Sequence, residues 1–209
     1  MNSGRFFLMF FGYPIANARF LMGVKEQMIA ILRNSGTARI RFRYSNGTVD
    51  VNINQDVFRR VASGLESGHF RVVENRYPDN RLTYSAWSDP STGDESNTFY
   101  LGRNNRSSRD FDALVVHEAL HAYMDLVRIS IPWVDNEAAA YIAQGFYLRN
   151  SGYPESRMEP GEPYRVGFLI AQTIANGVDA SSMIADLRAN LLADPRYRHY
   201  IRATFHGNG

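Results

Sequence analysis

The sequence predicts a single α+β domain, residues 1–209, in which a small twisted sheet with a β-hairpin precedes a mainly helical C-terminal part. Two alternating apolar runs on either side of Asn46-Gly47 predict the hairpin. Apolar residues at helical spacing predict several amphipathic helices in the second half of the chain. With 44% hydrophobic and 13% aromatic residues, the chain can bury one sizeable core. Residues 1–35 also fit a small N-terminal addition to this domain.

The N-terminal residues carry two competing signals. Arg5, the apolar run at 6–11 and the small residues at 16–18 resemble a secretory signal with its cleavage site. Gly12, Tyr13 and Pro14 interrupt the apolar run and leave it short, which favours a first strand or loop packed on the core. No run approaches the roughly 18 apolar residues of a membrane span, so none is expected, and the cellular compartment stays open.

Local patterns indicate the elements that follow. Residues 16–34 carry an apolar stripe at helical spacing, which predicts a helix that Gly36 ends. The hairpin strands are expected at 39–44 and 48–53, with the arginines of the first strand on its solvated side. The next elements expected are a helix at 54–66, a strand at 70–73, a polar loop at 89–97 and a strand at 98–102.

The stretch His117-Glu118-Ala119-Leu120-His121 is the most informative part of the chain. Residues 111–131 contain apolar side chains at helical spacing and neither Gly nor Pro, and Ser107, Ser108 and Asp110 offer N-caps, so a helix is expected here. Positions i and i+4 share one face of a helix, so the two imidazoles can converge on one ion with Glu118 beside it. Such polar side chains on an apolar helix are costly without a partner, and a metal ion supplies one.

A catalytic zinc site usually takes three protein ligands and leaves the fourth position to water. The metzincin pattern would place its third histidine at residue 127, which is Val127 here, so the third ligand must come from elsewhere. A second helix is expected at 133–144, opening after Pro132 with acids in its first turn. Small residues at 138–140 and 143 allow this helix to approach the first one closely.

From residue 114 to residue 144 the chain resembles the gluzincins, the thermolysin-like zinc peptidases, in a small and minimal form. Their third ligand is a Glu on a second helix, often in an Asn-Glu pair, which Asn136-Glu137 matches. The resemblance implies a zincin-like fold that binds Zn²⁺ through His117, His121 and Glu137. It also makes Glu118 the general base.

Two alternatives to Glu137 as the third ligand stay open in the sequence. Asp135 occupies a similar place and would be the ligand in an aspzincin-like site, although the residues that surround the aspzincin ligand are missing. Glu137 can also be an acid that only stabilises the start of its helix through the helix dipole.

The chemistry expected of a zincin needs a second donor for the oxyanion besides the metal. Tyr141, one turn beyond Glu137, is the catalytic candidate for this role, and the other candidates are Tyr123, Tyr164, His199 and His206. Asp125, one turn beyond His121, is a candidate for orienting a ligand imidazole. The resemblance further implies that an extended substrate pairs with the free edge of the strand at 98–102.

The end of the chain is expected to be helical. Turn formers between Gly152 and Pro163 predict a loop that either connects two elements or covers the cleft. Helices are expected at 164–176 and 180–192, the second capped by Asp179 or Ser181.

Composition excludes some classes of function. The absence of cysteine excludes disulfides and cysteine-ligated zinc. A net charge of +2, with Lys25 the only lysine, makes no case for nucleic acid. The sequence therefore predicts a zinc metallopeptidase that acts on a peptide or protein substrate. The alternatives are a non-catalytic zincin-fold binding or regulatory protein and a zinc hydrolase that cleaves another kind of bond; the oligomeric state stays open.

Overall fold

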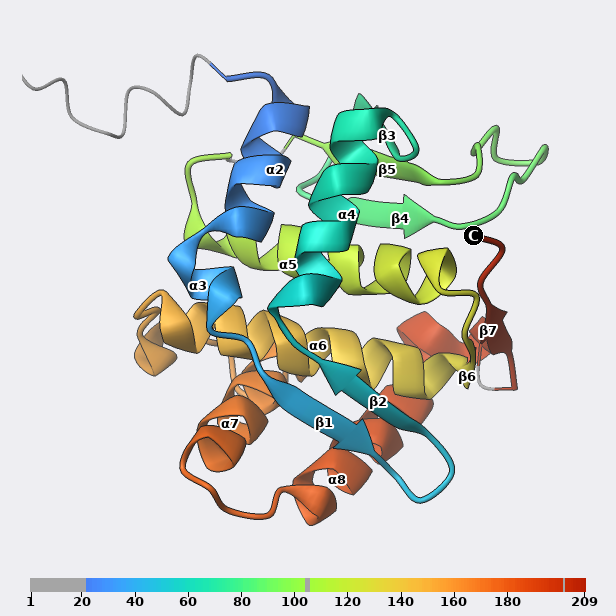
Figure 1. Cartoon of the computed structure of the whole chain (residues 1–209). Helices are drawn as coiled ribbons and strands as arrows, with labels where there is room; N and C mark the ends of the chain where they lie inside the picture. Colours follow the sequence, from blue (N-terminus) through green and yellow to red (C-terminus); the bar gives the residue numbers. More distant parts are fainter. Residues whose placement is uncertain (1–21, 104–105, 201) are drawn as a thin grey trace, which may run out of the picture.

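The computed structural model describes residues 22–103, 106–200 and 202–209, without the side chains of residues 198 and 199. The expected N-terminal strand or signal segment, residues 5–18, lies outside this part. The described chain is a mixed α+β fold in which helices predominate and the strands form small sheets (Figure 1). None of its helices combines the length and apolar character that crossing a membrane requires.

A three-stranded sheet belongs to the first half of the chain. β3 (Arg71–Tyr77), β4 (Leu82–Ser85) and β5 (Thr98–Gly102) lie in the order β3-β5-β4, with β3 parallel and β4 antiparallel to the central β5. β4 was not expected from the sequence, and β3 extends to Tyr77 rather than ending at residue 73 as expected. Most of β3 is exposed, and its residues do not alternate regularly between buried and exposed. β3 is therefore a strand because it pairs with the fully buried β5, and its own residue pattern does not predict it.

The position of β5 contradicts one expectation. The strand at 98–102 was expected to offer a free edge to a substrate, but β5 has a partner on each side and all its residues are buried. The two edge strands of this sheet are β3 and β4, and β4 is the one that packs against the helix that carries His117 and His121.

Two helices from the first half of the chain pack against each other. α2 (Val24–Arg33) and α4 (Gln55–Ser67) contact each other and α5, and their apolar faces join the main core (Figure 1). α2 ends at Arg33 rather than at Gly36, because Asn34 caps a further short helix, α3 (Ser35–Ala38), by accepting the N–H of Thr37 at 3.0 Å. The part of the expected helix before residue 22 lies outside the described residues.

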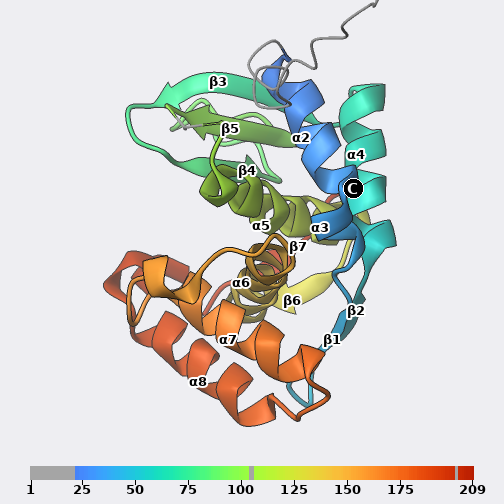
Figure 2. The same ribbon diagram turned by 90° about the vertical axis from the view of Figure 1, so that its left-hand side faces the viewer.

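α5 (Arg109–Leu126) and α6 (Trp133–Asn150) run side by side in opposite directions through the middle of the molecule (Figure 2). Ser108 is the N-cap of α5, and its Oγ accepts the N–H of Phe111 at 3.1 Å. α5 ends at Leu126 and does not continue toward residue 131. Arg128 adopts a left-handed φ of 55°, and the chain turns into the short strand β6 (Ser130–Pro132). α6 continues past residue 144 to Asn150.

The C-terminal part covers the far side of α6. A turn of 3₁₀ helix, η1 (Glu155–Arg157), lies in the expected loop, and α7 (Pro163–Ala175) and α8 (Ser181–Ala193) confirm the two expected helices. The N-cap of α8 is Ala180, which has no capping side chain, so the expected cap by Asp179 or Ser181 was wrong; Asp179, one residue earlier, accepts the N–H of Ser181 at 3.0 Å. The 3₁₀ helix η2 (Pro195–Tyr200) and the strand β7 (Thr204–His206) were not expected. β7 pairs antiparallel with β6 at the start of α6.

The hairpin is confirmed, but it does not belong to the main sheet. β1 (Phe42–Ser45) and β2 (Asp50–Ile53) form a separate two-stranded sheet, with Phe42 opposite Ile53 and Tyr44 opposite Val51. The apolar face packs on α6, where the rings of Phe42 and Phe146 stack with centroids 5.2 Å apart. On the outer face of the first hairpin strand, Arg43 is exposed, as expected, and so is Arg41 just before the strand.

Two glycines let α6 and α7 touch through their backbones. A Cβ atom on Gly145 would lie 2.3 Å from the carbonyl carbon of Gly167, and a Cβ atom on Gly167 would lie 2.2 Å from the carbonyl oxygen of Tyr141. No larger residue fits at this crossing. α7 therefore holds the middle of α6 in place, and with it the side chain of Tyr141.

Replacing Gly167 by Ala should destabilise the protein. A Gly→Ala change inside an ordinary helix raises stability by about 0.5–1 kcal/mol, whereas forcing an extra methyl into a closed contact costs about 1–3 kcal/mol. We expect urea denaturation of G167A to show a lower free energy of unfolding than wild type. S182A, on the exposed face of α8, is the control and should change little. Higher stability in G167A would contradict the close crossing of α6 and α7.

Candidate metal centre

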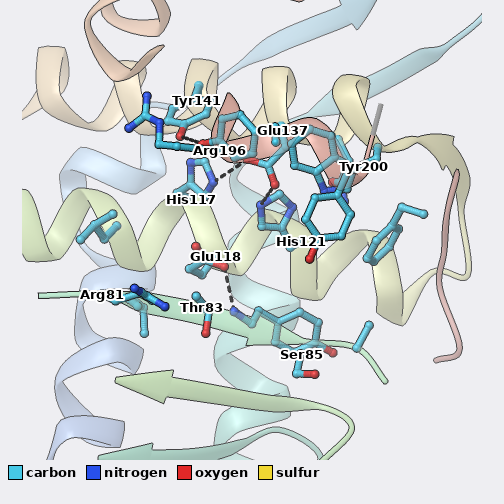
Figure 3. A pocket seen from close by; sticks show the side chains of 18 of the residues that line it. Arg81, Thr83, Ser85, His117, Glu118, His121, Glu137, Tyr141, Arg196 and Tyr200 are labelled. Atoms are coloured by element: carbon cyan, nitrogen blue, oxygen red, sulfur yellow. Dashed lines mark hydrogen bonds and ion pairs between the residues drawn. The ribbon is translucent and has the colours of Figure 1, made fainter. Parts of the chain in front are cut away.

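Three side chains from two helices converge at the centre of the molecule (Figure 3). His117 and His121 lie on one face of α5, and Glu137 lies in the second turn of α6. The Nε2 atom of His117 is 3.6 Å from one carboxylate oxygen of Glu137, and the Nε2 atom of His121 is 3.3 Å from the other. One ligand atom from each residue lies within 4.8 Å of the other two. The structure thus brings together the three residues that the sequence analysis selected as ligands.

The spacing of these donors fits a zinc ion. Ligands at about 2.0–2.1 Å from zinc in a tetrahedron lie about 3.4 Å from each other, close to the separations found here. Two imidazoles and a carboxylate form a donor set that zinc accepts readily. The Nδ1–H of His117 donates to Oε1 of Gln144 at 3.1 Å, which leaves the Nε2 lone pair of His117 facing the other donors. Gln144, two helical turns beyond Glu137, was not predicted as part of the site.

The second imidazole lacks such a partner. The Nδ1 atom of His121 and the Oδ1 atom of Asn136 are both buried without a hydrogen bond in the described part of the chain. The Asn136 side chain nevertheless raises the pKa of His121, as a nearby acceptor does. A small rotation of the amide would let Asn136 accept the proton of His121 and fix this imidazole as well.

Electrostatics couples the imidazoles to the carboxylate. Burial lowers the pKa of His121, but the charge of Glu137 and the hydrogen bond to it outweigh burial and raise this pKa to about 9. Burial by itself would raise the pKa of Glu137, but the two imidazoles outweigh burial and hold the pKa of this carboxyl far below its usual range. Without metal, the centre therefore contains an ionised carboxylate and a protonated imidazole in contact. A metal ion would take the place of that proton.

Glu118 projects from the same helix toward the sheet. Its carboxylate is buried, with 9% of the residue exposed, and accepts the backbone N–H of Tyr84 on β4 at 2.8 Å (Figure 3). Burial raises its pKa, which the nearby histidines partly offset. A carboxylate with a raised pKa beside a metal site suits a general base. Tyr84 was not predicted as a site residue, because nothing in the sequence links β4 to α5.

Asp135 is not a ligand, which removes the alternative third ligand. Its carboxylate is fully buried on the opposite side of α6, where Oδ1 accepts from the hydroxyl of Tyr44 at 2.5 Å, Nδ2 of Asn46 at 2.6 Å and Nε of Arg188 at 2.6 Å. These contacts tie the hairpin and α8 to the first turn of α6. Asp135 thus holds the helix that carries Glu137.

Asp125 does not orient a ligand imidazole, contrary to expectation. It is fully buried and accepts a hydrogen bond from the hydroxyl of Tyr84 and another from the N–H of Asn208, the latter at 2.6 Å. The side chain of Asn208 also donates to the carbonyl of Ala86. Asp125 therefore joins α5 to the end of β4 and to the C-terminal residues.

The three candidate ligands line a cleft of about 1060 Å³ between β4 on one side and η2 with residues 203–205 on the other. Tyr141 lies in this cleft, with its ring centroid 4.6 Å from that of His117 in an edge-to-face arrangement and its hydroxyl 2.5 Å from that of Tyr197. Burial, reinforced by nearby Tyr197 and Glu137, raises the pKa of Tyr141. Burial also raises the pKa of Tyr197, to about 12. Both tyrosines therefore keep their protons near neutral pH.

The other oxyanion candidates have different positions. Tyr164 lines the cleft, and its hydroxyl accepts the N–H of Glu159 at 3.1 Å. Tyr123 is not among the lining residues of the cleft, and neither is His206, whose Nδ1 lies 3.0 Å from the hydroxyl of Ser130. The side chain of His199 lies outside the described part of the structure.

Comparisons of this chain with protein-family models, curated proteins and solved structures found no match. The inference of function therefore depends on the residues and geometry of this centre.

We predict that the protein binds one zinc ion per chain through His117, His121 and Glu137. Elemental analysis after reconstitution should find stoichiometric zinc in wild type and none in the H117A/H121A double variant. D135N should retain zinc, because the Asp135 carboxylate faces the hairpin and α8. Q144A should weaken zinc binding about 10–100-fold through loss of the bond to His117. Loss of zinc in D135N, with full retention in E137A, would exclude the proposed ligand set.

The metal-free protein should lose stability as the pH rises from neutral. The pKa of His121 in the fold is raised from 6.5 to about 9, so the stability that its proton contributes is fully present below pH 6.5 and is lost as the pH rises through 9. Urea denaturation in a chelator should show this decline more strongly in wild type than in H121N. A steeper decline in H121N would refute the coupling between His121 and Glu137.

Proposed function

We propose that the protein is a zinc-dependent peptidase. The observation that carries the proposal is the arrangement of four side chains. His117, His121 and Glu137 each bring one ligand atom within 4.8 Å of the other two, while Glu118 lies buried on α5, the helix that carries both histidines. The cleft that contains them is large enough for several residues of a peptide.

The protein residues have separate roles in the proposed reaction. Zinc, when bound, acidifies water and polarises a carbonyl group. The Glu118 carboxylate accepts the proton of the attacking water as the water oxygen bonds to the carbonyl carbon. When the carbon–nitrogen bond breaks, Glu118 passes this proton to the leaving nitrogen. The N–H of Tyr84 holds Glu118 toward β4, where the pleated edge would guide an extended chain.

The free edge of β4 supports a peptide as substrate. All four residues of β4 line the cleft, and the strand has β5 as its strand partner on one side only, while the N–H of Tyr84 donates to Glu118. An extended peptide can add to such an edge through main-chain hydrogen bonds, which recognise the backbone rather than one side chain. β4 thus takes the role that the sequence analysis gave to residues 98–102.

The test is E118Q. Gln is nearly isosteric with Glu and keeps the contact with the backbone of β4, but it cannot accept the proton of water. We expect E118Q to bind zinc as wild type does and to lower kcat by about 10²–10⁴-fold. The measurement is digestion of a proteome-derived peptide library by zinc-loaded wild type and E118Q, followed by kinetics on a cleaved peptide.

Each outcome of this test is informative. Cleavage by E118Q at the wild-type rate would remove Glu118 from the mechanism. A zinc-loaded wild type that cleaves no peptide would overturn the proposal and favour a non-catalytic binding protein. Hydrolysis of a small ester or amide substrate, without peptide cleavage, would indicate a zinc hydrolase of another specificity.

A further inference from the structure

Tyr197 lies across the face of α6 that carries Glu137. Its ring packs against Trp133 with centroids 4.9 Å apart, and its hydroxyl lies 2.5 Å from the hydroxyl of Tyr141. Trp133 and Tyr141 are one turn before and one turn after Glu137, and they lie about 12 Å apart along the helix. A side chain that contacts both bridges the stretch of α6 on which Glu137 lies, and burial, helped by the negative charge of Glu137, raises the pKa of Tyr197. Tyr197 is 60 residues away from Glu137 in sequence and was not among the candidates for catalysis.

Several contacts hold Tyr197 in this position. The guanidinium of Arg196 lies 5.8 Å from its ring centroid, and its backbone N–H donates to the carbonyl of Asp194 at 3.0 Å. Arg196 is in turn paired with Asp194 at 2.6 Å and with Glu162 at 3.5 Å (Figure 3 shows Arg196 beside Tyr141). These contacts fix the phenol in the wall of the cleft that contains the candidate centre, and a catalytic donor must be held in this way before any substrate arrives.

The two tyrosine hydroxyls together have one proton that is not used in the hydrogen bond between them. Two phenols carry two protons, and the bond between them uses one. Within the described part of the chain, no other hydrogen bond engages either hydroxyl. Both tyrosines line the cleft: Tyr141 extends from α6 and contacts the ring of His117 edge to face, whereas Tyr197 belongs to the wall formed by η2. The arrangement in which Tyr141 donates to Tyr197 leaves the proton of Tyr197 directed to the cleft.

We propose that Tyr197 is the catalytic residue that donates a hydrogen bond to the oxygen of the scissile carbonyl as negative charge develops there. Tyr141 is its positioning residue, because a phenol that accepts one hydrogen bond becomes a stronger donor of another. This inference rests on the proposed peptidase function. It moves direct contact with the substrate from Tyr141 to a residue that only the tertiary structure reveals.

The test compares Y197F, Y141F and the double variant, all zinc-loaded. Y197F should lower kcat by about 10²–10³-fold, as loss of an oxyanion donor does, with little change in KM. Y141F should have a smaller effect, and the double variant should resemble Y197F, because both changes break the same chain of hydrogen bonds. Y153F, a tyrosine outside the cleft, is the matched control and should be unchanged.

A second readout does not depend on turnover. A phosphonate analogue of the cleaved peptide presents a tetrahedral group with a charged oxygen, and calorimetry measures its affinity for the zinc-loaded protein. Y197F should weaken this affinity by a factor similar to the loss in kcat, while the affinities for zinc and for the peptide product stay unchanged.

The outcomes separate the two proposals. If wild type is active and Y197F is equally active with equal phosphonate affinity, the role of Tyr197 is refuted and the peptidase function stands. If Y141F alone causes the large loss, Tyr141 is the direct donor and the assignment to Tyr197 is wrong. If zinc-loaded wild type neither cleaves peptides nor binds the phosphonate, both proposals fail.

Discussion

The packing of α5 against α6 is the contact on which the candidate site depends, because each helix alone carries an incomplete set of donors. Fully buried alanines are frequent on α6, and one of them, Ala140, lies on the same side of the helix as Glu137, where α5 packs against it. This packing brings Glu137 to both imidazoles and Gln144 to His117. The site is thus built by the hydrophobic core, which holds the three candidate ligands close together.

The buried carboxylates around the site each have their own hydrogen-bond partners. Asp135 engages Arg188 and Tyr44, and Asp125 engages Tyr84 and the C-terminal residues. Each of these carboxylates thereby gains the hydrogen bonds that burial requires, and each joins a distant element to α5 or α6. Glu137 and Glu118 are left to face the cleft. Buried carboxylates therefore have two roles: the two aspartates hold distant elements together, and the two glutamates are candidates for metal binding and catalysis.

The walls of the cleft come from parts of the chain that are far apart in sequence. β4 supplies one wall, and η2 with residues 203–205 supplies the other, after the chain has crossed the molecule through α7 and α8. The pairing of β6 with β7 returns the chain to the start of α6. Residues that recognise a substrate are therefore expected on both walls, whereas the candidate metal ligands lie between them on the helices.

The sequence by itself determined the features that depend on local spacing. The helical period placed His117, Glu118 and His121 on one helix, and the alternation around Asn46-Gly47 specified the hairpin. The small residues beside Glu137 indicated the helix that would approach. Tertiary structure alone decided the edge strand, the end of α5 at Leu126 and the positions of Tyr84 and Tyr197. These depend on contacts between residues distant in the chain, where no local period or propensity carries the information, so packing and hydrogen bonding in the folded core decide the outcome.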